Sequence, residues 1–314
     1  LKMIDNTYTL KEIIGYGGSS RVFSATDTSN TSYAIKAIRK DKGYQSEMEA
    51  MMVLREYLVM EHVGEHPNIV KHFSCNPEGQ LLHQEQHQKV CYNVVEFCKN
   101  GSLATIIKKT GAIEETVARF MFFQLSHAIL HLHNQNFAHL DIKLENTLLD
   151  GFFNVKLGDF GSGVSLVKTK GMTANKVGTP LYMPPEVANL KSGKIYDGKA
   201  ADIYSLGVTL CLMLLGEIPT EFSKSNDGST VCSSNFSDDE VMDVEEELRL
   251  MDYLSPDSKQ LLEMMMNEDP SKRPSIQQVL AHSWTSTPFS EGIETQVYQE
   301  MSARTQDLSE QPQF

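Results

Sequence analysis

The chain has 314 residues, of which 40% are hydrophobic and 22% are charged, and its formal net charge is −13. These proportions are typical of a soluble globular protein, and the length allows one large domain or two lobes with a buried core. The net charge disfavours nonspecific binding to nucleic acid and favours basic partners, although solubility alone would explain it equally well. We therefore expect a globular protein with no nucleic-acid partner.

The apolar segments and the cysteines indicate which compartments the chain suits. The longest apolar candidate, residues 206–215, is too short to span a bilayer, so no membrane span is expected. The chain begins with Leu1 and not with Met, as a fragment would, and its first residues lack the apolar stretch of a signal peptide. The five cysteines show no zinc-ligand spacing, and their odd number argues against a disulfide framework: Cys75, Cys91, Cys98, Cys211 and Cys232. Reduced thiols in a cytoplasmic or nuclear compartment are expected.

The first hundred residues carry mainly strand patterns. Alternating residues over 8–14, 21–25 and 33–38, separated by a glycine-rich turn and a polar turn, predict an antiparallel meander. Apolar residues at helical spacing then predict a helix over 46–63. Two further strands are expected over 69–75 and 90–97, joined by a polar loop over 76–89.

Helical patterns dominate after residue 101. They predict helices over 103–109, 114–134, 200–215, 255–267 and 275–282, the last two opened by the N-cap candidates Ser255 and Ser275. Residues 221–240, rich in Ser, Asn and Asp, are expected to form a flexible insertion. The prediction is an α+β fold. A small antiparallel β-sheet lobe with one major helix covers 1–97, a larger and mainly α-helical lobe covers 98–284, and a polar C-terminal tail covers 285–314.

The strongest chemical signal lies in the segment His139-Leu140-Asp141-Ile142-Lys143-Leu144-Glu145-Asn146. It brings an Asp, a Lys and an Asn close together, and Asp159-Phe160-Gly161 follows after a predicted hairpin. Phosphoryl transfer needs cations for the phosphoryl oxygens, carboxylates that hold Mg²⁺, and a carboxylate that orients the attacking hydroxyl. The two segments resemble those of eukaryotic-type serine/threonine protein kinases. Leu140 departs from the family pattern, because most members have Arg at this position.

The resemblance implies a bilobal kinase fold that uses ATP and Mg²⁺, and it assigns roles to individual residues. Asp141 would accept or orient the proton of the substrate hydroxyl, and Lys143 would stabilise the γ-phosphoryl group. Asn146 and Asp159 would each bind a Mg²⁺ ion. Thr179, in Gly178-Thr179-Pro180, would bridge Asp141 and Lys143, which is a feature of serine/threonine kinases.

The same resemblance implies that the β-rich lobe binds ATP. Lys36 would contact the α- and β-phosphates and would be held by an acid from the following helix. Glu47, Glu49 and Glu56 compete for that role; Glu56 fits the family's spacing to its His-Pro-Asn turn, and Glu49 is the second choice. A plain hairpin turn would explain the glycines at 15–18 equally well. The implied nucleotide-binding residues are Gly15, Tyr16, Gly17, Gly18, Ser19, Val22, Ala34, Lys36, Val95, Glu96, Cys98, Ser102, Asn146, Leu148 and Asp159.

Three further residues have structural roles in the family. Glu186 is expected to pair with Arg273, and Asp202 is expected to cap the backbone of the catalytic loop. In the family, the Arg that Leu140 replaces commonly pairs with a phosphate on the activation segment, here residues 159–186. Because Leu140 cannot do so, we expect basal activity without phosphate at the two candidate acceptors. These acceptors are Thr169 and Thr173, and the alternative is that Lys176 or Arg39 takes over the pairing.

Two other function classes compete with this interpretation. A pseudokinase or scaffold would use the same fold for binding only. It would lack one of four residues that are all present here: Lys36, Asp141, Asn146 and Asp159. A small-molecule kinase of related fold is disfavoured by the peptide-docking features at 178–186.

His83 and His87 would have the spacing of metal ligands on a helix, but no third ligand is evident, so a metal site there is not expected. The final helices most resemble those of the calcium/calmodulin-dependent and AMP-activated groups. We expect protein substrates, with basic residues near the target favoured by Glu145, and a regulatory partner that the sequence does not identify.

Overall fold

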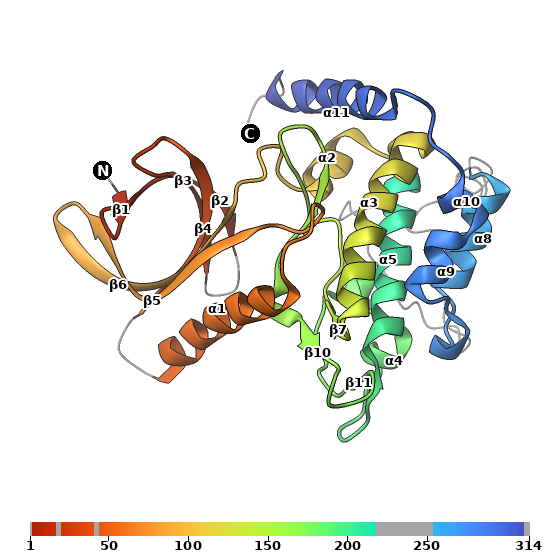
Figure 1. Cartoon of the computed structure of the whole chain (residues 1–314), viewed down its shortest axis with the longest axis horizontal. Coiled ribbons are helices and arrows are strands. Elements are labelled where there is room, and N and C mark those ends of the chain that lie inside the picture. Colours follow the sequence, from red (N-terminus) through yellow and green to blue (C-terminus); the bar gives the residue numbers. More distant parts are fainter. Residues whose placement is uncertain (1, 17–19, 41–43, 218–253, 311–314) are drawn as a thin grey trace. The chain divides into compact units, whose positions relative to one another are not determined.

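The computed structural model describes residues 2–16, 20–40, 44–217 and 254–310. The chain divides into two compact units, Leu1–Lys99 with Asp159–Gly161 and Asn100–Gly158 with Ser162–Phe314. Gly17 to Ser19 of the glycine-rich turn lie outside the described residues, as do Leu1 and the predicted insertion over 221–240, which includes Cys232. The elements of each unit are labelled in Figure 1.

The strands of the smaller unit form a closed barrel. Neighbouring strands pair antiparallel in the order β1-β2-β3-β4-β6-β5, and β1 also pairs with β5. The strands pair antiparallel as expected, but β1, which was not predicted, pairs with both β2 and β5 and closes the sheet into a barrel. The elements of this unit are β1 (Lys2–Ile4), β2 (Tyr8–Tyr16), β3 (Arg21–Thr26), β4 (Ser32–Arg39), α1 (Tyr44–Val63), β5 (His72–His83) and β6 (Gln86–Glu96).

Asp5, in the turn after β1, holds the barrel closed. Its Oδ2 accepts hydrogen bonds from the Asn76 amide at 2.6 Å and the Tyr92 hydroxyl at 2.7 Å, and its Oδ1 accepts from the Gln80 N–H at 2.6 Å. Its own N–H donates to the Gln80 carbonyl. The left-handed backbone at Asp5 (φ 49°) is one that a short polar side chain tolerates. One residue thus fixes β1 against both β5 and β6.

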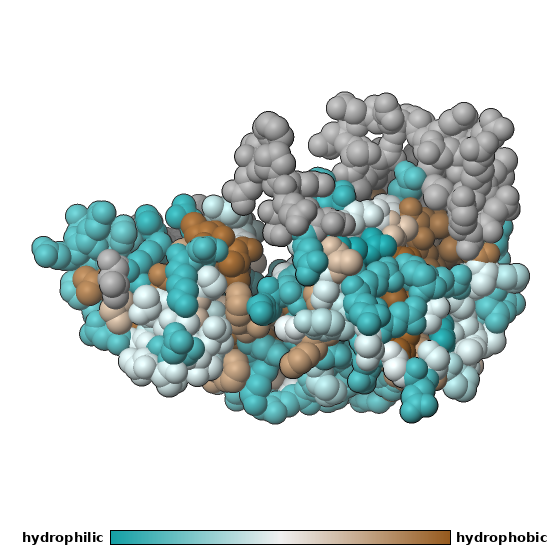
Figure 2. Space-filling view, turned by 90° about the horizontal axis from the view of Figure 1, so that it is seen from above, coloured by the Kyte–Doolittle hydropathy of each residue, from teal (hydrophilic) through white to brown (hydrophobic). Residues whose placement is uncertain are grey.

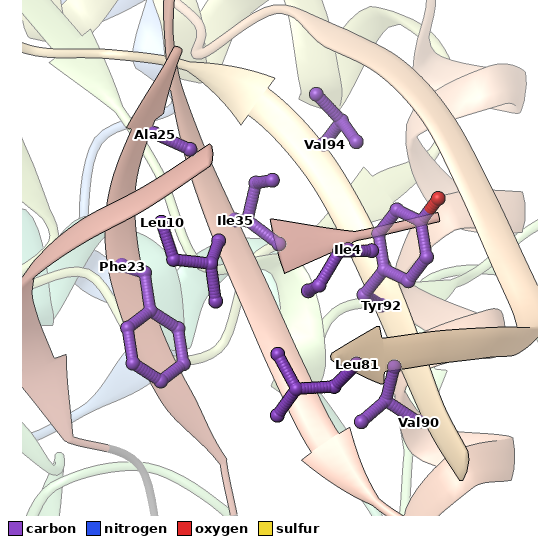
Figure 3. Packing of buried hydrophobic residues seen from close by; sticks show 9 residues of the cluster. All are labelled: Ile4, Leu10, Phe23, Ala25, Ile35, Leu81, Val90, Tyr92 and Val94. Carbon is purple, nitrogen blue, oxygen red and sulfur yellow. The ribbon is translucent and has the colours of Figure 1, made fainter. Parts of the chain in front are cut away.

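Nine hydrophobic side chains from all six strands fill the barrel interior and point toward one another (Figure 3). Because side chains alternate across a strand, the residues between them in β3, β4 and β6 lie on the outer face. The barrel core therefore determines which residues are presented outside it. The nine core residues are Ile4, Leu10, Phe23, Ala25, Ile35, Leu81, Val90, Tyr92 and Val94.

The polar loop expected over 76–89 is wrong, since β5 and β6 continue through it as a hairpin. His83 pairs with Gln86 across a two-residue turn at Gln84 and Glu85, whose φ angles are 49° and 64°. Two consecutive left-handed residues match the twist of paired strands, so a tight turn forms without glycine. The polar composition concealed the hairpin because only Leu81 in this stretch is needed for the core.

The larger unit is mainly helical. Ser255 and Ser275 cap their helices as predicted, and Ser275 forms a capping box with Gln278. Its elements are α2 (Leu103–Thr110), α3 (Glu115–Asn134), β7 (Phe137–Ala138), β8 (Thr147–Leu149), β9 (Val155–Leu157), β10 (Val164–Ser165), β11 (Met172–Thr173), η2 (Pro180–Tyr182), α4 (Pro185–Ala188), β12 (Tyr196–Asp197), α5 (Gly198–Leu215), α8 (Pro256–Met265), η3 (Pro270–Lys272), α9 (Ile276–Ala281), α10 (Ser283–Ser286) and α11 (Ile293–Glu310); the 3₁₀ turn η1 (Phe160–Ser162) crosses the unit boundary.

Helix α5 forms the centre of the larger unit. Among the described residues it is the one helix with the length and apolar composition of a membrane-crossing segment, and 89% of it is buried inside the unit. Burial of this kind is typical of a core helix.

Hydrophilic residues cover most of the face shown in Figure 2, where hydrophobic residues appear in separate patches.

The stretch expected to be a polar tail contains the long helix α11. Its side chains Ile293, Val297 and Met301 are buried, and it packs against α2 and α3. The guanidinium of Arg304 donates to the carbonyls of Thr110, Gly111 and Ala112, at the C-terminal end of α2 and just after it. The buried positions are four residues apart, so α11 has the one-sided apolar stripe of a docked helix.

Replacing Met301 by Ala is expected to destabilise the larger unit, because Met301 is fully buried. Loss of a buried Met side chain costs about 2–5 kcal/mol. Gln299→Ala, on the exposed side of the same helix, is the matched control. Chemical denaturation of both variants measures the difference, and equal free energies of unfolding would show that α11 is not part of the folded unit.

Candidate active-site residues

In the smaller unit, Lys36 on β4 is held between two carboxylates. Its Nζ lies 2.9 Å from Glu56 Oε2 and 2.9 Å from Asp159 Oδ1. Glu56 comes from α1 and is 5% exposed, whereas the Asp159 side chain is 47% exposed. Burial by itself lowers the pKa of Lys36, but the two carboxylates outweigh it and hold this pKa above its usual value. Lys36 therefore carries a positive charge that is fixed in position.

The predicted nucleotide-binding residues of the barrel strands share its outer face. Across β2, β3, β4 and β6 the register pairs Gly15 with Val22, Val22 with Lys36, and Ala34 with Val95. Directly paired residues lie on the same face of a sheet. Tyr16 ends β2 and is exposed, and no Cβ clash would arise at Gly15, where the nearest atom lies 3.5 Å away.

The connection after β6 carries two predicted residues, Glu96 and Cys98. The Glu96 N–H donates to the Lys71 carbonyl at 2.8 Å, and the Glu96 carboxylate accepts from the Lys71 N–H. The Glu96 N–H is thus already engaged within the protein. Cys98 is buried. In the larger unit, Ser102 caps α2 and forms an isolated bridge with Leu148 of β8.

The larger unit brings the catalytic-loop residues together. The Thr179 hydroxyl donates to Asp141 Oδ1 at 2.9 Å and accepts from Lys143 Nζ at 2.6 Å. Lys143 Nζ also lies 2.8 Å from Asp141 Oδ2. The Asn146 amide donates to both the carbonyl and Oδ2 of Asp141, at 2.8 and 3.1 Å. Asp141 is thus oriented by three side chains.

A buried carboxylate positions the backbone of this loop. Asp202 of α5 is 0% exposed and accepts from the N–H groups of His139 and Leu140, at 2.9 and 2.8 Å. His133 of α3 lies 3.0 Å from the same carboxylate, and the His139 ring bonds the Gly158 carbonyl at 3.1 Å. These bonds offset the strain of the left-handed backbone at Leu140, whose φ is 63°.

A family model of the protein kinase domain matches residues 8–285. The chain belongs to the protein kinase family. Helix α11 begins beyond the matched residues.

Three relatives illustrate the similarity. The kinase chain is 32% identical to serine/threonine-protein kinase SIK1 of Rattus norvegicus over 88% of its own length and 32% of the relative's. It is 31% identical to CBL-interacting protein kinase 31 of Oryza sativa subsp. japonica over 93% of its length and 60% of the relative's. With the cell cycle serine/threonine-protein kinase CDC5/MSD2 of Saccharomyces cerevisiae it shares 28% identity, over 96% of its length and 39% of the relative's. The chain thus spans only part of each of these relatives.

Leu140 belongs to an apolar cluster that includes the activation segment. Leu166, Val177 and Met183 of that segment, and Val187 just after it, pack with Leu140 and with residues of β7, β12 and α5. Gly178 approaches the loop so closely that a Cβ there would lie 2.9 Å from the Leu140 carbonyl, and its φ is 113°. Only glycine fits this position.

A buried ion pair closes the activation segment. Arg273 donates to both carboxylate oxygens of Glu186, at 2.7 and 2.8 Å, and its side chain is fully buried. The guanidinium also donates to the carbonyls of Asn267, Glu268 and Ala200. This bidentate, fully hydrogen-bonded geometry is the one in which a buried pair is well compensated.

Sequence reasoning missed three supporting residues. His133 contacts Asp202, the Tyr182 hydroxyl contacts both Glu145 and the Leu144 N–H, and the Ser205 hydroxyl donates to the Tyr182 carbonyl. Each reaches its partner across a long stretch of chain, so no local pattern could reveal the contact. His72 of β5 was also overlooked. Its Nδ1 is buried without a hydrogen-bond partner among the described residues, and burial, aided by the Lys36 charge, lowers its pKa to about 4.

His72 is expected to make the smaller unit sensitive to acid. Between pH values of about 6.5 and 4 the unfolded chain binds a proton at this residue and the folded chain does not, so stability falls as pH falls through that window. His72→Leu should remove this dependence, which amounts to at most about 1.4 kcal/mol per pH unit. Urea unfolding across this window tests it, with His87→Leu on the exposed part of the hairpin as matched control. Parallel pH profiles for wild type and His72→Leu would contradict it.

Proposed function

We propose that this chain transfers the γ-phosphoryl group of ATP to Ser and Thr hydroxyls of protein substrates. The observation that carries the proposal is the Thr179 hydroxyl between Asp141 and Lys143. This contact links the activation segment to the two residues that would face the reacting hydroxyl and phosphoryl groups. Membership of the protein kinase family and the similarity to serine/threonine kinases support the same conclusion.

The chemistry of the loop suits direct transfer. Asp141 would accept the proton of the attacking hydroxyl while the new O–P bond forms and the bond from the γ-phosphorus to the bridging oxygen of ADP breaks. Lys143 would compensate the charge on the transferred group. With one carboxylate oxygen bonded by Thr179 and the other by Lys143 and Asn146, Asp141 has a fixed orientation before substrate binds. Such preorganisation lowers the barrier without reorganisation during the reaction.

Kinases of this family use ATP with Mg²⁺, which neutralises phosphate charge when bound. Oxygen donors are the ligands that Mg²⁺ prefers, and the ion usually takes few from the protein itself. Asn146 and Asp159 fit this requirement. The Asn146 amide nitrogen is engaged with Asp141, so its Oδ1 is the atom suited to a cation, and the Asp159 carboxylate is about half exposed.

We assign ATP binding to the outer face of the barrel. Lys36 would contact the α- and β-phosphates, and Gly15, Val22, Ala34 and Val95 would surround the nucleotide. The shared face of these residues supports the assignment. The Glu96 carbonyl and main-chain groups of Cys98 would bond adenine, and Ser102 and Leu148 would complete the set by resemblance. The assignment also includes Tyr16 and residues 17–19 of the glycine-rich turn.

We further propose that basal activity does not require phosphate on the activation segment. The apolar packing around Leu140 supports this, since it orders the segment without an Arg–phosphate pair. Thr173 is buried in the β11–β12 pairing and is 6% exposed. Lys176, the alternative cation, donates to the Ala188 carbonyl at 2.6 Å. The usual phosphate-dependent ordering is therefore replaced by hydrophobic contacts.

The substrates are proposed to carry basic residues near the target hydroxyl. Glu145 is exposed, and the Tyr182 hydroxyl donates to its Oε2 at 3.1 Å, which holds a negative charge beside the catalytic loop. The chain's net charge of −13 acts in the same direction. The rice relative is named for its interaction with CBL, and on that analogy we propose a regulatory protein partner for this kinase.

Phosphoryl transfer to a Ser/Thr peptide library is expected to fall about 10²–10⁴-fold in Asp141→Asn, because the variant loses the proton acceptor. Asp159→Ala should also be inactive. Asp257→Asn makes the same chemical change at an exposed position of α8 and is the matched control. A wild type that binds ATP without transferring phosphate would instead identify a pseudokinase.

The double variant Thr169→Ala/Thr173→Val should retain activity within about twofold of wild type, the scale of substitutions outside critical contacts. Val keeps the β-branched shape of Thr173. Mass spectrometry of the wild type establishes whether either residue carries phosphate. Loss of activity in the variant, together with phosphate in the wild type, would refute phosphate independence.

A further inference from the structure

Two cysteines of the smaller unit lie on the outer face of the barrel, next to the row that contains Lys36. Asn93 of β6 pairs with Lys36 on one side and with Cys75 of β5 on the other. Cys91 stands two residues before Asn93 on the same strand and therefore on the same face. Cys75 and Cys91 are thus diagonal neighbours across two paired strands, and their thiols influence each other: Cys91 raises the pKa of Cys75, and Cys75 lowers the pKa of Cys91.

This face of the sheet is attached to helix α1 by side-chain hydrogen bonds. The Cys91 thiol donates to the Ala50 carbonyl at 3.6 Å, and the Asn93 amide donates to the Val53 carbonyl at 3.0 Å. Ala50 and Val53 are three residues apart and lie on one side of the helix. The next residues along that side lead to Glu56, which holds Lys36. Cys91 therefore supports the helix that positions the catalytic ion pair.

The two thiols differ in their access to solvent. Cys91 is 0% exposed, whereas Cys75 is half-buried. Among the described residues the remaining cysteines, Cys98 and Cys211, are buried. An oxidant that enters from solvent would therefore meet Cys75 first and would find a second thiol behind it.

We propose that Cys75 and Cys91 form a redox-responsive thiol pair, which hydroperoxides convert to a disulfide that detaches Cys91 from α1. Hydrogen peroxide would oxidise one of the two sulfurs to a sulfenic acid as the O–O bond breaks and one water leaves. The sulfur of the other cysteine then attacks it, the S–S bond forms, and the sulfenic oxygen leaves as a second water. The two thiols lose two electrons and two protons, and one peroxide becomes two waters.

The disulfide changes one specific contact. A sulfur in a disulfide has no proton, so Cys91 can no longer donate to the Ala50 carbonyl. A diagonal pair must also draw its strands together to reach disulfide geometry, because the Cβ atoms of a disulfide lie about 3.8 Å apart. The β-bulge between Asn76 and Gly79, beside Cys75, allows β5 to move. Both effects weaken the contact between Cys91 of β6 and Ala50 of α1.

The test treats the full reduced chain with hydrogen peroxide, blocks the remaining thiols by alkylation, and maps the peptides without reduction. A cross-link between the peptides of Cys75 and Cys91 is expected, with Cys98 and Cys211 still alkylated as free thiols. Hydrogen exchange then compares the amides of residues 50–60 in the two redox states. Faster exchange is expected after oxidation, and reduction should reverse it.

Two variants distinguish a specific response from general damage. Cys75→Ser should form no cross-link and show no peroxide-dependent change in α1 exchange, although it keeps Cys91 in place. Cys211→Ala, in the larger unit, is the matched control and should respond as wild type. Absence of the Cys75–Cys91 cross-link would overturn the proposal, and a cross-link with unchanged α1 exchange would overturn its link to the helix. Neither readout depends on kinase activity.

Discussion

The loop that contains Asp141 depends on one buried carboxylate, that of Asp202. Its two oxygens accept hydrogen bonds from the N–H groups of His139 and Leu140, and the His133 ring contacts the same carboxylate. A bulky residue in the left-handed region is strained, and these bonds keep Leu140 in that conformation. The turn they stabilise aims Asp141 toward Thr179 and Lys143. Loss of this carboxylate would leave several backbone donors unsatisfied in a dry interior.

The same turn places Leu140 in an apolar cluster with residues of the activation segment. The segment is held by hydrophobic packing on Leu140, by the close approach of Gly178, and by the Glu186–Arg273 pair at its end. Hydrophobic packing does not respond to a phosphate, whereas a charge-assisted pair does. On the proposal of phosphate-independent activity, leucine at this position would order the segment by packing, while the hydrogen bonds around Asp141 stay intact.

In the smaller unit, the barrel and α1 cooperate to hold Lys36. The barrel core leaves Lys36, Asn93 and Cys91 on the outer face, and the last two bond to carbonyls of α1. The helix in turn supplies Glu56. Polar contacts between a sheet and a helix are specific in geometry, so they transmit small displacements better than apolar packing alone. This is why a change at the thiol pair would reach the ion pair.

The sequence by itself predicted most helical segments of the larger unit, because periodicity and caps are local properties of the chain. It also indicated the Glu56 partner of Lys36 through its spacing to a neighbouring motif, and the resemblance to kinases implied the Glu186–Arg273 pair. Only the tertiary structure decided the closure of the barrel by β1, the β5–β6 hairpin, the docking of α11, and the contacts of His133 and Cys91. Closure of the barrel depends on hydrogen bonds between Asp5 and residues 71 to 87 positions later in the chain. Helix α11 packs on α2 and α3, and its Arg304 bonds Thr110, 194 residues earlier. Contacts of this kind arise from the packed arrangement of distant segments, which no local pattern of residues encodes.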